Sequence, residues 1–198
     1  MPDSALRYEV NCSILFTELP LLRRPAAAAA AGFDAVEFWW PFSSSAPTTG
    51  ELEDFADAVQ QAGVTLAGLN FSAGDMAGDR GLVSWPGREN EFADNVEATI
   101  QLGTRLGCRA FNALYGNRLD GLDPQQQDEV AMQNLATAAA AAHQVGGVVL
   151  VEPLSGADRY PLRTVADVVA LAVRAAATPG LRFDGVMGYE SQLSLIHI

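Results

Sequence analysis

Short apolar runs alternate with longer Ala- and Leu-rich segments along almost the whole chain. The apolar runs predict strands at residues 8–13, 35–40, 65–71, 109–115, 148–152 and 181–183. The segments between them predict helices at residues 21–31, 50–61, 89–106, 124–145 and 165–177. Regular alternation of strand and helix indicates an α/β fold with a parallel sheet and helices outside it. The pattern leaves two architectures open, an open doubly wound sheet and a closed (β/α)8 barrel.

Glycine marks the ends of three predicted helices. Gly32, Gly63 and Gly107 each follow a helical segment, and an apolar run begins within a few residues. Glycine at this position permits the left-handed backbone conformation that terminates many helices. The repeated junction predicts one continuous βα architecture.

Composition excludes several classes of function. The chain has 198 residues and is 49% hydrophobic, a composition that predicts one globular domain. Its formal charge of -12 predicts repulsion of nucleic acid and of anionic membranes. All 12 basic residues are arginines, and the missing lysine excludes Schiff-base chemistry on the chain. No apolar segment is long enough for a membrane span and no signal peptide is evident, which predicts a cytoplasmic protein with reduced cysteines.

Glu152 is the first candidate for a catalytic residue. It ends the apolar run at residues 148–152 and is followed by Pro153 and a glycine-containing loop. This arrangement predicts a buried parallel strand that places one carboxylate at its carboxyl end, where α/β proteins carry their chemistry. The alternative is a solvated acid at the start of a loop. Nucleotide-binding glycine loops and the Gly-x-Ser-x-Gly motif of serine hydrolases are absent from the sequence.

Six separated segments of the chain, in matching order and spacing, resemble the hydroxypyruvate isomerase family. They are residues 16–20, 31–38, 78–82, 86–89, 116–117 and 151–154. The resemblance implies a xylose isomerase-like (β/α)8 TIM barrel that interconverts hydroxypyruvate and tartronate semialdehyde, or a related 2-oxo sugar acid, as an intramolecular oxidoreductase. It implies that Glu152 transfers the proton and binds a divalent metal, Mg²⁺ or Mn²⁺, whose preferred ligands are oxygens.

The resemblance also implies further site residues. Asp184 aligns with a metal-binding Asp, although the residues after it depart from the family and an ordinary turn Asp is the alternative. Asn70 and Asn117 are expected to bind substrate hydroxyls, with turn formation as the alternative. Arg80 and Arg88 flank a loop expected to act as a lid, and one of them is expected to hold the substrate carboxylate.

Two other positions are relevant to the predicted site. Glu37 matches the family but is interpreted mainly as a structural carboxylate, and Asn112 stands where relatives often carry a histidine.

The predicted domain covers residues 7–184 and contains about six βα units of an incomplete barrel, whereas residues 185–198 do not follow the family. We therefore expect a C-terminally truncated chain, with the second catalytic carboxylate missing and exposed strand edges that favour a homo-oligomer. Three readings stay open. They are an isomerase, a sugar epimerase or endonuclease of the same superfamily, and an inactive N-terminal fragment.

Overall fold

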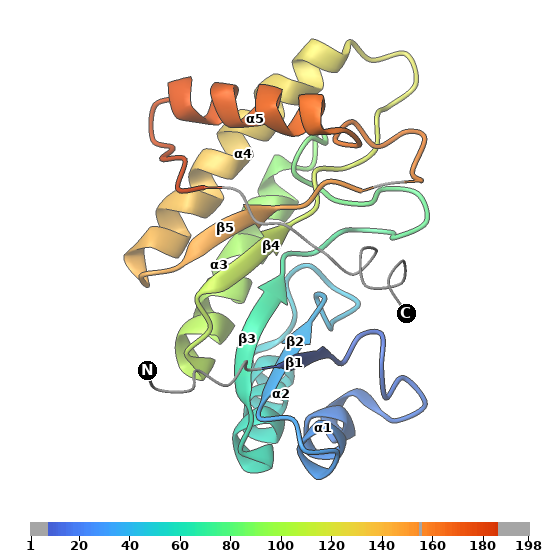
Figure 1. Cartoon of the computed structure of the whole chain (residues 1–198), viewed down its shortest axis with the longest axis vertical. Helices are drawn as coiled ribbons and strands as arrows, with labels where there is room; N and C mark the ends of the chain where they lie inside the picture. The colour runs from blue at the N-terminus through green and yellow to red at the C-terminus, as the bar shows by residue number, and fades with distance from the viewer. Residues whose placement is uncertain (1–7, 155, 186–198) are drawn as a thin grey trace, which may run out of the picture.

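The computed structural model describes residues 8–154 and 156–185, which form five parallel strands with helices between them. The strands are β1 (Glu9–Asn11), β2 (Ala35–Phe38), β3 (Thr65–Asn70), β4 (Ala110–Ala113) and β5 (Val148–Val151). The helices are η1 (Leu21–Arg23), α1 (Arg24–Ala30), α2 (Thr49–Ala62), α3 (Glu89–Leu106), α4 (Pro124–Gln144) and α5 (Val165–Ala177). Figure 1 shows each strand followed along the chain by its helix.

The order of the strands distinguishes between the two predicted architectures. Each strand pairs in parallel with the next strand along the chain, in the order β1-β2-β3-β4-β5. A doubly wound sheet reverses its strand order at a switch point, whereas a barrel keeps sequential order with all helices on the outside. Helix α2 contacts α3 and α3 contacts α4, so these helices cover the same face of the sheet. The predicted TIM-barrel type of α/β fold is confirmed.

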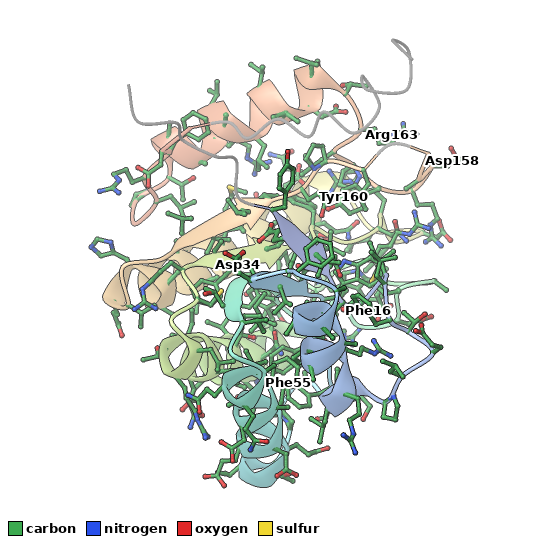
Figure 2. All side chains as sticks on the ribbon, turned by 60° about the horizontal axis from the view of Figure 1, so that its bottom comes forward. Phe16, Asp34, Phe55, Asp158, Tyr160 and Arg163 are labelled. Atoms are coloured by element: carbon green, nitrogen blue, oxygen red, sulfur yellow. The ribbon has the colours of Figure 1, made fainter. Side chains whose placement is uncertain are left out.

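The core lies between this face of the sheet and the helices. Alternate residues of each strand point toward the helices, and Val36, Phe38 and Phe111 are fully buried there. Phe38 meets Phe55 of α2, which is labelled in Figure 2, edge to face, with ring centroids 5.0 Å apart. Packing of this kind fixes the strands relative to the helices, and thereby the positions of the residues at the strand ends.

The opposite face of the sheet carries polar side chains. Asn11, Glu37 and Asn112 alternate with the buried core residues of their strands and therefore point away from the helices. The Glu37 side chain lies across Gly68 of the next strand, where an added Cβ would come within 3.1 Å of its Cγ. In a barrel this face is the interior, so the fold concentrates polar groups on its inner surface.

Some predicted elements are wrong or shifted. Residues 181–183 form no strand, and Arg182 pairs instead with Asp184, two residues further on. The helix expected from residue 21 begins as a 3-10 turn, and its α-helical part starts only at Arg24 because Pro25 is best accommodated in a first turn. The glycine stops are confirmed at Gly63 and Gly107, which have left-handed backbones at the ends of α2 and α3. The non-family tail lies outside the described residues from position 186 onward.

Two observations concern expectations drawn from composition. No helix within the described ranges is long and apolar enough to cross a membrane. Cys12 and Cys108 are both buried and free, and burial raises the pKa of Cys12 to about 11 and that of Cys108 above its usual value. Both thiols therefore stay protonated and unreactive near neutral pH.

Candidate functional site

Three polar residues form a row at the carboxyl ends of neighbouring strands. Asn70 ends β3, Asn112 is its register partner in β4, and Glu152 directly follows β5. Asn112 donates a hydrogen bond from Nδ2 to Oε2 of Glu152 over 2.9 Å. Glu152 is exposed, so one carboxylate oxygen is held in place while the other is accessible to a ligand. The predicted position of Glu152 at the carboxyl end of β5 is confirmed, but the predicted burial of this strand is wrong, because no residue of β5 is fully buried and Val148 is exposed.

Tyr160 fixes the backbone at Glu152. Its hydroxyl donates to the carbonyl oxygen of Glu152 (2.9 Å) and accepts from the backbone N–H of Tyr115 (2.7 Å). Burial raises the pKa of Tyr160 above its usual range, so its hydroxyl remains protonated and can donate. Tyr160 thereby ties the segment after β5 to the segment after β4.

Replacing Tyr160 by Phe should destabilise the protein by about 1–3 kcal/mol, because the buried N–H of Tyr115 loses its only acceptor among the described residues. Urea unfolding would measure the change. Tyr8→Phe is the matched control, since Tyr8 is 68% exposed and its hydroxyl bridges no strands. Equal stability of the two variants would contradict the role given to Tyr160.

Glu37 lies near the row and shares its electrostatic environment. Burial raises the pKa of the Glu37 carboxyl, and the charges of Glu9 and Glu152 raise it further. A hydrogen bond of 2.5 Å from Nδ2 of Asn11 to Oε1 of Glu37 acts in the opposite direction. Glu37 therefore accepts a hydrogen bond from a neighbouring side chain rather than from the backbone. The negative charges of Glu37 and Glu152 repel each other.

The raised pKa of Glu37 predicts that Glu37→Gln increases the stability of the folded protein by an amount that depends on pH. A carboxyl whose pKa is raised by folding contributes stability below its unfolded pKa, near 4.5, and loses that contribution as pH rises through the folded value. The variant should therefore be more stable than the parent at neutral pH, with the difference vanishing below about pH 4.5. Unfolding curves at several pH values would test this expectation.

Glu51→Gln is the control with the opposite sign. Hydrogen bonds from Thr48 lower the pKa of Glu51, so its loss should destabilise the protein at neutral pH and matter less as pH falls through the lowered value. If both variants changed stability in the same direction, the electrostatic account of Glu37 would be wrong.

A cavity of about 530 Å³ adjoins the row on the side of β2 and β3. Loops that follow these two strands surround it, and its lining includes Trp40, Phe42, Asn70 and Arg88. Trp40 and Phe42 also pack on the core, with ring centroids 5.1 Å apart. The cavity therefore has a partly aromatic wall and reaches Asn70 at the end of β3.

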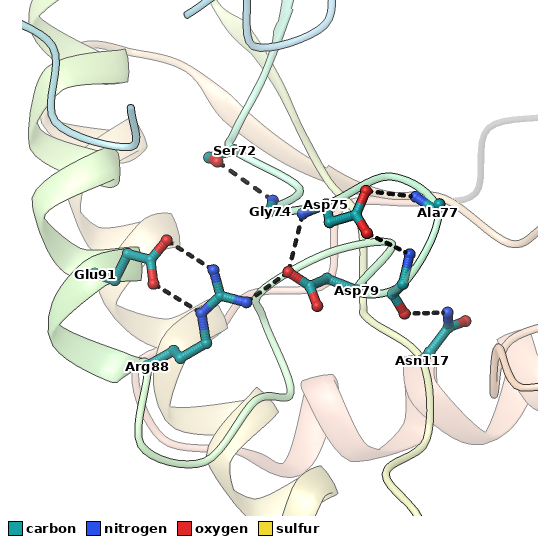
Figure 3. A network of polar contacts seen from close by, with 9 residues as sticks. Ser72, Gly74, Asp75, Ala77, Asp79, Arg88, Glu91 and Asn117 are labelled. Atoms are coloured by element: carbon teal, nitrogen blue, oxygen red, sulfur yellow. Dashed lines mark hydrogen bonds and ion pairs between the residues drawn. The ribbon is translucent and has the colours of Figure 1, made fainter. Parts of the chain in front are cut away.

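The loop between β3 and α3 is braced by a polar network (Figure 3). The guanidinium of Arg88 donates to Asp79 over 2.6 Å and to both carboxylate oxygens of Glu91 over 2.7 and 2.9 Å. Hydrogen bonds to these carboxylates raise the pKa of Arg88 above its usual range. The charge of Arg88 is thus balanced within the protein, and its predicted contact with a substrate carboxylate stays a prediction.

Asn117 and Arg80 belong to the same loop network. Asn117 is buried, and its Nδ2 donates to the carbonyl oxygen of Gly78 over 2.8 Å. Arg80 has a left-handed backbone (φ 52°), and its Nε donates to the carbonyl oxygen of Met76 over 3.5 Å. Both residues hold the loop, and their predicted contacts with substrate remain predictions.

The residues described do not fit a divalent metal. Within residues 8–154 and 156–185, no three His, Cys, Asp or Glu side chains are grouped to hold a metal ion. Both carboxylate oxygens of Asp184 accept hydrogen bonds from Arg182, over 2.6 and 3.0 Å. Hard cations prefer oxygen ligands, and Glu37 is the carboxylate near Glu152, so the described residues do not supply a grouped set of three such ligands. The metal role of Glu152 and Asp184 stays a prediction.

The structure thus groups Glu152 with Asn70 but places Arg80, Arg88 and Asn117 in the loop network. Sequence reasoning missed Tyr160 as a site residue, and it noted Asn112 only as a departure from the family's histidine, without giving it a role. The signal for Asn112 was available, because it is a polar residue on the strand face opposite the apolar Phe111. Nothing local in the sequence pointed to Tyr160, whose partners lie 8 and 45 residues away.

Comparison with known proteins identifies a family and several relatives. The family described as xylose isomerase-like TIM barrel matches residues 25–183. A Streptomyces coelicolor protein named "Putative hydroxypyruvate isomerase" is 51% identical over 180 residues, which cover 88% of this chain and 64% of the relative. The hydroxypyruvate isomerase of Escherichia coli is 33% identical over 154 residues, covering 77% of this chain and 57% of the relative.

Two further similar proteins are not named hydroxypyruvate isomerase. The 2-oxo-tetronate isomerase of Cupriavidus necator is 36% identical over 153 residues, covering 77% of this chain and 56% of the relative. The crystal structure of a family 2 AP endonuclease from Brucella melitensis has a TM-score of 0.73 and 34% identity, covering 85% of this chain and 64% of that one. The chain therefore spans less than two thirds of the length of each of these four proteins.

Proposed function

The chain belongs to the xylose isomerase-like TIM barrel family, and on that premise we propose that it functions as an isomerase of hydroxypyruvate or a related 2-oxo sugar acid. The single observation that carries the proposal is the accessible Glu152 carboxylate at the carboxyl end of β5, held by Asn112. Relatives named hydroxypyruvate isomerase and 2-oxo-tetronate isomerase support the substrate class.

The proposed reaction moves hydrogen between neighbouring carbons. The free oxygen of Glu152 removes a proton from C3 of hydroxypyruvate, and the electron pair of the broken C–H bond forms the C2–C3 double bond of an enediolate. The electron pair of the C2 carbonyl moves to its oxygen in the enediolate. Return of a proton to C2, with transfer of the proton of the C3 oxygen to the C2 oxygen, gives tartronate semialdehyde. The hydrogen bond from Asn112 keeps the other oxygen of Glu152 occupied, so one defined atom faces the substrate.

No step of this reaction is assigned to a metal ion, because the described donor groups do not make a site for one. Electrostatics also bear on the choice between activities. The formal charge of -12 opposes binding of a polyanionic DNA backbone, so the name of the Brucella protein is not carried over to this chain.

Turnover in D₂O tests the proposal. We expect the chain to convert hydroxypyruvate to an aldehyde seen by proton NMR, with deuterium appearing at the carbon that receives the solvent proton. Pyruvate, which lacks the C3 hydroxyl, is the control substrate and should yield no aldehyde. Absence of both aldehyde formation and deuterium incorporation from hydroxypyruvate would contradict the proposed function.

A further inference from the structure

Two side-chain oxygens in the row of site residues have no hydrogen-bond donor. Oδ1 of Asn70 and Oδ1 of Asn112 are shielded from solvent, and neither accepts a bond from the described part of the chain. Asn70 is only 3% exposed as a whole residue. A buried acceptor without a donor costs folding free energy, and at a functional site the missing donor is often supplied by a ligand.

The orientation of Asn112 follows from its neighbour. Its Nδ2 donates to the carboxylate of Glu152, and rotating the amide by half a turn would place oxygen against oxygen. Oδ1 of Asn112 is therefore fixed on the other side of the amide. Asn70 is its partner in the parallel register, so the two side chains lie on the same face of the sheet about 4.8 Å apart at the backbone.

The surroundings define which ligand group suits this pair. An amide oxygen accepts hydrogen bonds only, so its partner must carry an O–H or N–H group. The carboxylates of Glu37 and Glu152 lie nearby and repel an anionic group at this position. Asn70 lines the cavity, so space for a ligand adjoins this member of the pair.

We infer that Asn70 and Asn112 form an acceptor pair that selects ligands by their hydroxyl groups and turns the carboxylate end of a keto acid away from β3 and β4. This inference rests on the proposed function and deepens it. In hydroxypyruvate the only alcoholic hydroxyl is on C3, so binding that hydroxyl places the carbon that loses its proton beside Glu152. The single O–H of that hydroxyl is shared between Oδ1 of Asn70 and Oδ1 of Asn112 as a three-centre hydrogen bond. Asn112 then has two functions, because it positions Glu152 and accepts part of this bond.

Binding discrimination between hydroxypyruvate and pyruvate tests the pair. The measurement uses Glu152→Gln as the parent chain, so that neither ligand is consumed, and dissociation constants come from calorimetry. We expect the parent to bind hydroxypyruvate at least about tenfold more tightly than pyruvate, the ratio that one hydroxyl contact provides. Adding Asn70→Leu, which keeps the side-chain size but leaves Asn112 as the one acceptor of the pair, should reduce the ratio several-fold.

A stability measurement separates a binding role from a structural one. Because Asn70→Leu removes an unsatisfied buried oxygen, the variant should melt at the same temperature as the parent or higher. Asn134→Leu is the matched control, since Asn134 is equally buried but donates to the carbonyl oxygen of Val83 over 2.9 Å. That variant should melt at a lower temperature and keep the binding ratio.

Three results would overturn the inference. They are an unchanged ratio in Asn70→Leu, a loss of melting temperature as large as in Asn134→Leu, and no binding of hydroxypyruvate to the parent. Failure of the proposed function is recognised separately, by absent turnover in the wild-type chain. Hydroxyl-dependent binding without turnover would leave the acceptor pair standing, whereas turnover with an unchanged ratio would remove only the pair.

Discussion

Glu152→Gln should lower the rate of hydroxypyruvate isomerisation by about 10²–10⁴-fold, the contribution typical of a general base. Gln has the same shape, and its side-chain oxygen can still accept the bond from Nδ2 of Asn112. Only the capacity to take up a proton is lost. Substrate binding should therefore change little, and the loss should fall on kcat rather than KM.

The measurement is the initial rate of aldehyde formation at saturating hydroxypyruvate. Glu53→Gln is the matched control. Glu53 is an exposed carboxylate on α2, so its replacement removes the same charge at a position away from the site. It should retain the full rate. A Glu152→Gln chain that keeps more than about a tenth of the rate would show that another group removes the proton.

Gly81→Ala should destabilise the protein by more than about 4 kcal/mol, and much of the chain should be recovered unfolded or aggregated. The backbone of Gly81 has φ 125°, and an added Cβ would lie 2.0 Å from the carbonyl oxygen of Leu114. It would also come within 2.7 Å of the backbone nitrogen of Gly116. Backbone atoms cannot move aside as a flexible side chain can, so the loop or the end of β4 must be displaced.

Gly87→Ala separates the clash from the backbone conformation. Gly87 lies in the same loop and also has a positive φ of 85°, but an added Cβ there would meet no atom within 4 Å. It should cost only the conformational strain, about 1–2 kcal/mol. Soluble yield and thermal melting of both variants would test the difference, and equal losses would mean that close approach at Gly81 is not what limits the fold.

The sequence was sufficient to predict the order and type of most elements. Helix α3 was predicted with the bounds that the structure has, because an acidic first turn and the stop at Gly107 mark both ends. Residues 181–183 were predicted as a strand from three residues of Leu-Arg-Phe, a run too short for the period of two to be distinguished from chance. Neither periodicity nor composition specified sequential strand order, because pairing depends on contacts between distant segments.

The site could be predicted only in part, for a similar reason. Glu152 was recognisable because a carboxylate at the end of an apolar run has a local signature. Arg88 was expected to meet a ligand, but its pairing with Asp79 depends on how the loop after β3 folds back. Its pairing with Glu91 follows from helical spacing and was open to prediction.

The sequential strand order bears on how the protein is made. Because β1 pairs with β2, β2 with β3 and β3 with β4 in the described part of the chain, the first half of the sheet depends on sequence that leaves the ribosome first. Such a topology keeps the contact order moderate and allows the nascent chain to add one βα unit at a time to an existing edge. Glu152, which directly follows β5, would reach its asparagine partner only when that edge is already in place.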